Sequence, residues 1–276
     1  FGVKYMKKQI AGIRFYKGGR IYYFDALEFN LKKGNMVLVD TAFGKEAGEV
    51  VNIKSVTDIE ASKDYLPVIK VFDEGDYKVI KEQNKEREKY LKIAIDMVEK
   101  SGLEMKILDI NFGFDDNKLT FIFSSDSRID FRQLVKDLGA KLKKQIVLRQ
   151  IGPRDAARLL GGYGRCGRKL CCEAFLQSLD SITMDMAKYQ NLASKGASKI
   201  SGVCGKLMCC LAYEHDMYLE LKKDFPKVGK RVTTPRGEGK VIKHNALTSS
   251  VTVLLDEGGE FTVSVKDISP SRAGGA

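Results

Sequence analysis

The sequence predicts an α+β protein built from three parts. Strand-like segments at the amino end, alternating helices and strands in the middle, and strand-like segments at the carboxyl end indicate this class. The 276 residues, 43% of them hydrophobic, suffice for a buried core. The predicted boundaries are 1–60 for a β-rich part, 61–225 for a central α/β domain, 226–270 for an SH3-like barrel and 271–276 for a disordered tail.

The amino-terminal part is predicted to be a small barrel of short strands. Residues 9–15 and 21–24 have strand-like composition and flank Lys17-Gly18-Gly19-Arg20, which is typical of a hairpin turn. A third strand is expected at 36–39, and a turn between Gly44 and Gly48. Short strands at this spacing favour a barrel.

The central part predicts a layer of the order α-β-β-α-β. A long helix is expected over 76–100, with an apolar stripe formed by Ile80, Leu91, Ala94, Ile95 and Val98. Gly102 follows it as a cap. The further elements are strands at 105–110 and 119–123 joined through Asp115-Asp116-Asn117, a helix at 131–142, a strand at 146–151 and a helix at 154–160 after Pro153. This order predicts a sheet covered by helices on one face.

The last part is predicted to be β again. A helix at 181–190 precedes it, and strands are expected at 227–232, 241–242, 251–255 and 261–265, with turns at 235–239 and 257–259. This succession resembles the strand-turn-strand pattern of SH3-like barrels.

Positive charge is concentrated in one stretch. The net charge is +11, and residues 128–169 hold twelve basic against three acidic side chains. Such a stretch can attract RNA phosphates or an acidic protein partner, and a solvated basic face is the alternative. The candidate contacts are Lys141, Lys143, Lys144, Arg149, Arg154 and Arg158. The aromatic signature of RNA-recognition modules does not accompany them.

The six cysteines all lie between Cys166 and Cys210, and the other 231 residues have none. A secreted disulfide scaffold spreads its cysteines through the chain. The clustering therefore favours reduced thiols in a cytoplasmic protein. No apolar run reaches the length of a membrane span.

The cysteines form two copies of one motif, C-x4-C-C. Gly164-Arg-Cys-Gly-Arg-Lys-Leu-Cys-Cys-Glu-Ala-Phe175 aligns with Gly202-Val-Cys-Gly-Lys-Leu-Met-Cys-Cys-Leu-Ala-Tyr213. The candidate ligands are Cys166, Cys171 and Cys172 in the first copy and Cys204, Cys209 and Cys210 in the second, 38 residues later. Thiolates bind zinc or iron–sulfur clusters, and this spacing does not separate the two. A thiol redox switch and buried core thiols stay open as alternatives.

Four further features bear on where ligand sites are expected. Since adjacent side chains point in different directions, one cysteine of each Cys-Cys pair is expected to face the core or another site. His215 follows Cys210 by five residues and is interpreted as a surface histidine rather than a ligand. Residues 162–167 match G-x-G-x-x-G, but a helix instead of a strand is predicted before them, so a dinucleotide site is not expected. Asp115-Asp116 is interpreted as a turn.

These cysteine runs, with Met184-Asp-Met-Ala-Lys-Tyr-Gln-Asn-Leu192 between them, resemble the bacterial stage-zero sporulation protein family (YaaT, also called RicT). Its core domain is shared with a yeast polymerase-suppressor protein. The resemblance covers about residues 9–268. It implies a cytoplasmic, non-enzymatic regulator that works with two small helical proteins of the YlbF and YmcA types. It also implies [4Fe-4S] clusters, whose ligands the partners can share, with all six cysteines as candidate ligands.

The function expected from the resemblance is that of a regulatory scaffold. Such complexes promote messenger-RNA processing by RNase Y and affect sporulation, competence and biofilm formation. The alternatives are a zinc-stabilised nucleic-acid-binding module and a thiol redox sensor, redox enzyme or phosphorelay regulator.

Overall fold

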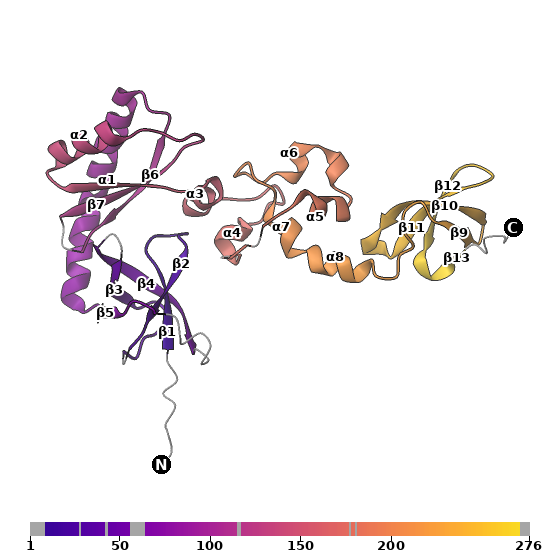
Figure 1. The fold of residues 1–276 in the computed structure, drawn as a ribbon, viewed down its shortest axis with the longest axis horizontal. Coiled ribbons are helices and arrows are strands. Elements are labelled where there is room, and N and C mark those ends of the chain that lie inside the picture. The colour runs from indigo at the N-terminus through magenta and orange to yellow at the C-terminus, as the bar shows by residue number, and fades with distance from the viewer. Residues whose placement is uncertain are drawn as a thin grey trace, which may run out of the picture. The chain divides into compact units, whose positions relative to one another are not determined.

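The computed structural model describes residues 9–27, 29–41, 44–55, 64–114, 117–176, 178–179 and 181–270. The chain divides into two compact units, Phe1–Gln177 and Ser178–Ala276 (Figure 1). Both helices and strands are present in each, which confirms the predicted α+β class. The predicted turn at Asp115-Asp116 and the predicted tail at 271–276 lie outside the described residues. The predicted domain boundaries stay predictions.

The first unit begins with a five-stranded antiparallel sheet of order β2-β1-β4-β3-β5. Its strands are β1 (Gln9–Arg14), β2 (Ile21–Asp25), β3 (Met36–Thr41), β4 (Gly44–Ser55) and β5 (Val68–Val71). A bridge between Asp25 and Pro67 brings the two edges of the sheet together. The enclosed core includes Ile13, Val37 and Val50, none of them exposed.

The predicted turn before Val50 is wrong, because β4 runs through it. Gly48 pairs with Val37 inside the ladder. A Cβ atom at Gly48 would lie 2.3 Å from the Cγ2 atom of Ile13. The glycine therefore serves close packing inside the sheet rather than a change of chain direction.

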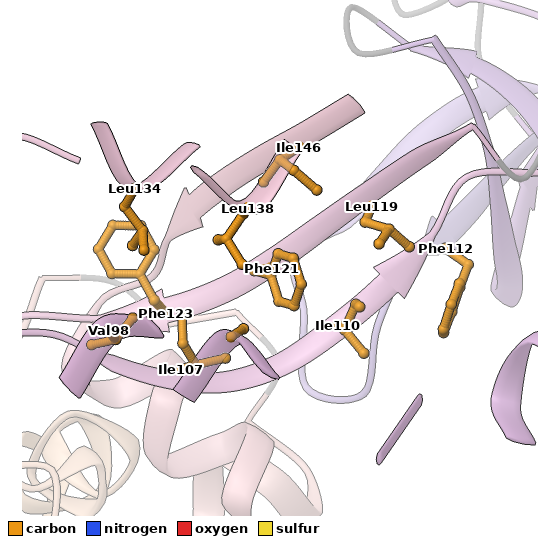
Figure 2. Close-up of a cluster of buried hydrophobic side chains, with 11 residues drawn as sticks. Val98, Ile107, Ile110, Phe112, Leu119, Phe121, Phe123, Leu134, Leu138 and Ile146 are labelled. Atoms are coloured by element: carbon orange, nitrogen blue, oxygen red, sulfur yellow. The ribbon is translucent and has the colours of Figure 1, made fainter. Parts of the chain in front are cut away.

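The second layer of this unit is a three-stranded sheet under two helices. Its elements are α1 (Glu74–Ser101), β6 (Lys106–Phe112), β7 (Lys118–Ser124), α2 (Arg132–Leu142) and β8 (Gln145–Gln150). β7 pairs antiparallel with β6 and parallel with β8, because the crossover through α2 returns the chain in the same direction. Figure 2 shows Phe121 and Phe123 of β7 among side chains of both helices and both neighbouring strands.

Helix α1 has the ends that the sequence predicts and a slightly different buried face. Asp73 and Asp76 form a reciprocal capping box at its start, and Gly102 ends it with φ of 66°. Ala94 and Val98 are buried, but Ile95 is 40% exposed and does not belong to the predicted stripe. The contacting face is centred on Ala94 and also holds Tyr90 and Met97, and Ile95 points about 100° away from Ala94 around the helix.

Both faces of the three-stranded sheet are covered, whereas the sequence predicts helices on one. Ile122 points away from the α1–α2 side and packs with Leu159 of α3 (Pro153–Leu160) and with Tyr16 from the β1–β2 turn. This second face explains why five consecutive residues of β7 are buried. A short helix, α4 (Cys171–Ala174), ends the described elements of the unit.

The second unit joins short helices to a five-stranded antiparallel sheet. The helical elements are α5 (Met184–Tyr189), η1 (Ala193–Lys195), α6 (Ala197–Ile200), α7 (Cys209–Tyr213) and α8 (His215–Leu221), so the helix predicted over 181–190 is shorter in the structure. The sheet comprises β9 (Arg231–Thr234), β10 (Gly237–Asn245), β11 (Ser250–Leu255), β12 (Glu260–Ser264) and β13 (Ser269–Pro270), with the short helices η2 (Ala246–Thr248) and η3 (Val265–Asp267). Its order is β12-β11-β10-β9-β13, around a valine-rich core.

Candidate metal centre

Two loops with the same backbone structure carry the six cysteines. We name residues 162–175 thiol loop 1 and residues 200–213 thiol loop 2. Thiol loop 1 belongs to the first unit and thiol loop 2 to the second. Each loop is closed by an isolated β-bridge at the same place, Tyr163 with Lys169 and Ser201 with Leu207.

The turn around the first cysteine has matching hydrogen bonds in both loops. In thiol loop 1 the Gly164 N–H donates to the Arg168 carbonyl at 2.8 Å, and the Gly167 N–H donates to the Gly164 carbonyl at 3.0 Å. In thiol loop 2 the equivalent distances are 2.9 Å from Gly202 to Lys206 and 3.0 Å from Gly205 to Gly202. The sequence repeat is therefore also a structural repeat.

A left-handed glycine follows the first cysteine of each loop. Gly167 has φ of 76° and Gly205 has φ of 73°. A side chain with a Cβ atom is strained in this region, so the motif requires glycine here. The same turn brings the sulfur of Cys166 within 3.5 Å of an ideal Cβ position on Gly164.

The second cysteine of each loop begins a short helix. The Leu170 N–H donates to the Gly162 carbonyl at 3.1 Å, and the Met208 N–H donates to the Ile200 carbonyl at 2.9 Å. These bonds fix where α4 and α7 begin. Consecutive helix residues point about 100° apart, so the two cysteines of a pair leave the helix in different directions.

The cysteines differ in exposure. Cys166 is exposed, Cys172 is 4% exposed, and the other four are half-buried. Cys172 therefore faces the interior, as expected for one member of a pair. Its counterpart Cys210 is only half-buried, so the two loops differ at this position.

Thiols are suitable ligands for a soft metal, but the described residues do not bring enough of them together to hold one. All six cysteines are thiols in this structure. Within the described part of the chain, no group of three or more His, Cys, Asp or Glu side chains is placed to hold a metal ion. A [4Fe-4S] cluster and a structural zinc site each take four protein ligands. A group bound at one loop would need further ligands, which a second protein can supply.

The surroundings of the loops differ in charge. Thiol loop 1 exposes Arg165, Arg168 and Lys169, whereas thiol loop 2 has Val203, Lys206 and Leu207 at these positions. At the matching end of each loop an aromatic side chain is exposed, Phe175 by 53% and Tyr213 by 63%. Both loops therefore offer thiols beside exposed apolar surface.

Comparison with known proteins identifies the family. Residues 66–151 match the PSP1 C-terminal conserved region, and residues 181–225 match the third domain of PSP1-like proteins. Over 247 residues the chain is 44% identical to Stage 0 sporulation protein YaaT of Bacillus subtilis (strain 168), which covers 89% of this chain and 90% of that protein. The chain belongs to the YaaT family. No solved structure matches it.

The two matched PSP1 domains contain one of the two loops. Thiol loop 2 lies inside the matched third domain, while thiol loop 1 lies between the two matched regions. The domain matches and the 44% identity confirm, at the level of the family, the resemblance that the cysteine runs indicate. The ligand role of the six cysteines stays a prediction.

Thiol loop 2 of this YaaT-family chain is held by buried polar groups that the sequence did not reveal. Gln190, 7% exposed, donates from its Nε2 to the carbonyl of Leu211 at 2.7 Å. Lys222 donates to the Tyr189 carbonyl and lies 4.9 Å from the centre of that ring. Burial lowers the pKa of Lys222. These residues join α5 to α7 and α8, and only their positions in the fold reveal the role.

His215 is not the surface histidine that the sequence suggests. Its ring is half-buried and lies edge-on to Tyr189, 5.8 Å between centres. Its Nδ1 atom is buried and has no hydrogen-bond partner among the described residues. Packing against Tyr189 accounts for the half-buried position of the His215 ring.

The basic stretch is split by the fold. Lys141 and Lys143 are exposed and Lys144 is half-buried at the end of α2. These three lysines of the YaaT-family chain form one basic helix end, which can attract phosphates. Lys143 ends the helix in the left-handed region with φ of 52°.

The three arginines of the predicted contact set make internal contacts. Arg149 donates to the Tyr22 hydroxyl at 3.0 Å and lies 5.6 Å from the centre of the Tyr16 ring. Arg158 is 7% exposed and donates to the Gly18 carbonyl at 3.4 Å. The Nε atom of Arg154 is buried. The structure therefore places Arg158 in the packing between α3 and the amino-terminal sheet, and not on an open basic face.

Proposed function

We propose that this chain is a non-catalytic regulatory subunit that acts in sporulation. The curated relative is named as a stage 0 sporulation protein, and the two chains align over nearly their full lengths. The more detailed part of the proposal, a metal cofactor, rests on the two thiol loops. Their shared backbone structure explains why the sequence holds two copies of one motif.

The proposed cofactor is a [4Fe-4S] cluster held by thiolates of a thiol loop together with ligands from partner proteins. Each loop presents an exposed or half-buried first cysteine beside a glycine turn. The N–H groups of such turns stabilise charge on sulfur. When bound, the cluster would join this chain to the partner protein through shared ligands, and oxygen or loss of iron would break that connection. This chain's residues would position the thiolates and offer the apolar rim at Phe175 and Tyr213 to the protein that completes the site.

The partners that the family resemblance suggests are two small helical proteins of the YlbF and YmcA types. In the same proposal the complex works in the cytoplasm, where thiols stay reduced, and directs RNase Y to its messenger RNAs. Competence and biofilm formation would then depend on it as well. The described residues include no helix long and apolar enough to cross a membrane. RNA contact is assigned to Lys141, Lys143 and Lys144, which share one helix end.

The test is replacement of the relative in living cells. A Bacillus subtilis strain without its YaaT protein receives this chain, and heat-resistant spores are counted. We expect spore formation to be restored by the unchanged chain and lost with the double variant Cys166→Ser and Cys204→Ser. Val203→Ser is the matched control, because Val203 is 61% exposed and adjoins Cys204.

Each outcome bears on a different part of the proposal. Failure of the unchanged, well-expressed chain to restore spores would contradict the sporulation role. Restoration by the double cysteine variant would contradict the role of the thiols and leave the sporulation role standing. The level of RNase Y-processed transcripts in the same strains tests the RNA step.

A further inference from the structure

A cleft in the second unit lies apart from the chemistry of the thiols. Its volume is about 640 Å³, and its walls come from the α5–η1 segment, α8 and the β10–η2 segment. None of the described residues that line it is a cysteine. It therefore needs an explanation of its own.

The walls of the cleft are positively charged. Lys188, Lys195 and Lys243 line it, and the described lining residues include no aspartate or glutamate. Lys188 forms a salt bridge of 2.8 Å with Asp185, and Asp185 does not line the cleft. Lys195 and Lys243 are exposed and have no salt bridge within the described part of the chain. A ligand for this cleft is therefore anionic.

The side of the cleft formed by the sheet is aliphatic. Val228 is 59%, Ile242 is 37% and Leu247 is 71% exposed, and all three line the cleft. Three exposed aliphatic side chains around one cavity leave apolar area that a ligand side chain can cover. The ligand thus combines negative charge with an aliphatic group.

One strand edge borders the cleft. β9 pairs with β10 from Gly237 to Lys240, and the preceding Gly229–Lys230 segment bonds to Val241, whereas β11 follows β10 on the other side up to Asn245. Ile242–Asn245 therefore line the cleft with the edge that β9 does not cover. There the side chain of Asn191, itself at φ of 58°, donates to the His244 carbonyl at 2.6 Å. A side-chain amide thus occupies a place that a neighbouring strand takes elsewhere in the sheet.

We propose that this cleft binds an extended acidic peptide segment of another protein, with an aliphatic side chain seated against Val228, Ile242 and Leu247. An extended polypeptide that displaces the Asn191 amide can run beside this strand edge and place alternate side chains in the cleft. Lys195 and Lys243 select carboxylates on the peptide. The proposal is independent of any metal at the thiol loops.

Nucleic acid fits the same cleft less well. Binding of single strands relies on aromatic rings on which bases stack. The rings among the described lining residues are those of Tyr218, which is half-buried, and His244, whose Nε2 donates to the Pro226 carbonyl at 2.7 Å. The His244 ring also packs on Phe225, 5.2 Å between centres. Neither ring is an open stacking surface.

The experiment measures peptide binding to the full chain by fluorescence anisotropy. The probe is a labelled seven-residue peptide of the sequence Asp-Glu-Leu-Asp-Glu-Ile-Asp, compared with one in which lysine replaces every acid and with a uridine dodecamer. We expect the acidic peptide to bind, and the double variant Lys195→Glu and Lys243→Glu to weaken it about tenfold or more. Leu247→Ser should weaken it about threefold. Lys266→Glu, an exposed lysine outside the cleft, should leave it within about twofold.

Three results would overturn the proposal. The first is no binding of the acidic peptide at millimolar concentration by the unchanged chain, folded as judged by circular dichroism. The second is equal weakening by Lys266→Glu, which would show only general charge attraction. The third is tighter binding of the uridine dodecamer through the same two lysines, which would make the cleft a nucleic-acid site. None of these results bears on the cysteines, so the proposed function is tested separately.

Discussion

Cys166 and Cys204 occupy the same position in two turns that share their hydrogen bonds, their left-handed glycine and the start of a short helix. One turn ends the first unit and the other lies in the second. The chain thus presents one thiol motif on each of two compact units.

The left-handed glycines are expected to control the stability of the turns. Gly167→Ala should cost about 1 kcal/mol, because alanine is strained at φ of 76°. Gly205→Ala should behave alike in the second unit. Urea unfolding at pH 7 measures both. The matched control is Gly164→Ala, whose φ is not left-handed and whose new Cβ would meet the Cys166 sulfur at 3.5 Å, an ordinary contact. Equal losses for Gly164→Ala and Gly167→Ala would contradict the assignment.

Arg158 is expected to stabilise the first unit rather than bind RNA. Arg158→Ala removes a nearly buried side chain and its bond to the Gly18 carbonyl, and should lower the free energy of unfolding by about 2 kcal/mol. Arg168→Ala, an exposed arginine of thiol loop 1, should change it by less than about 0.5 kcal/mol. Chemical denaturation compares the two. A smaller effect for Arg158 than for Arg168 would disprove the packing role.

The basic end of α2 is expected to contribute to RNA affinity through charge. Replacing Lys141, Lys143 and Lys144 by glutamine should reduce the slope of log affinity against log salt by about 2, at about 0.7 for each phosphate contact on a single strand. Filter binding of a uridine-rich RNA over a range of salt concentrations measures it. The control replaces three exposed lysines of α1, Lys81, Lys85 and Lys92. An identical slope in both triple variants would exclude this helix end as the contact.

The stability of the second unit is expected to fall as pH drops below about 6.5, and His244 is the reason. Burial lowers the pKa of His244 below its usual value, although the bond to the Pro226 carbonyl opposes this shift. The unfolded chain then takes up the proton more readily than the folded one. The stabilisation is therefore present above the unfolded pKa and is lost as pH falls toward the folded pKa.

Nuclear magnetic resonance can follow the titration of His244 directly, since the chain has only two histidines. His215→Gln identifies the signals of His244 by elimination. We expect a titration midpoint below that of free histidine and, for His244→Gln, a weaker dependence of stability on pH between 7 and 5. A midpoint above that of free histidine would reverse the sign and refute the burial argument.

Local patterns predicted most of the elements, and long-range packing decided the exceptions. The ends of α1 were predictable because Asp73 and Gly102 act on their nearest neighbours. The sequence predicts a turn at Gly48, because the contact that requires this glycine lies on another strand, at Ile13. The cover of Ile122 by Tyr16 was not predictable, since more than a hundred residues separate the two.

The same distinction holds for the candidate site. The glycines and cysteines of the two loops repeat in sequence, so their common structure could be expected. The burial of Arg158 could not, because the basic composition of its stretch suggests an open face. The half-buried position of His215 could not be predicted either, since the ring of Tyr189 reaches it only in the folded helices.

Metal content of the complex made without oxygen tests the central claim most directly. The chain is co-expressed with its two proposed helical partners and purified anaerobically, and iron, sulfide and zinc are measured beside the visible spectrum. The account predicts iron and sulfide in equal amounts with broad absorption near about 400 nm, as for [4Fe-4S] clusters. The variants Cys166→Ser and Cys204→Ser should lose iron, sulfide and this absorption, and Val203→Ser should keep them. A colourless complex with stoichiometric zinc, or with no metal at all, would contradict it.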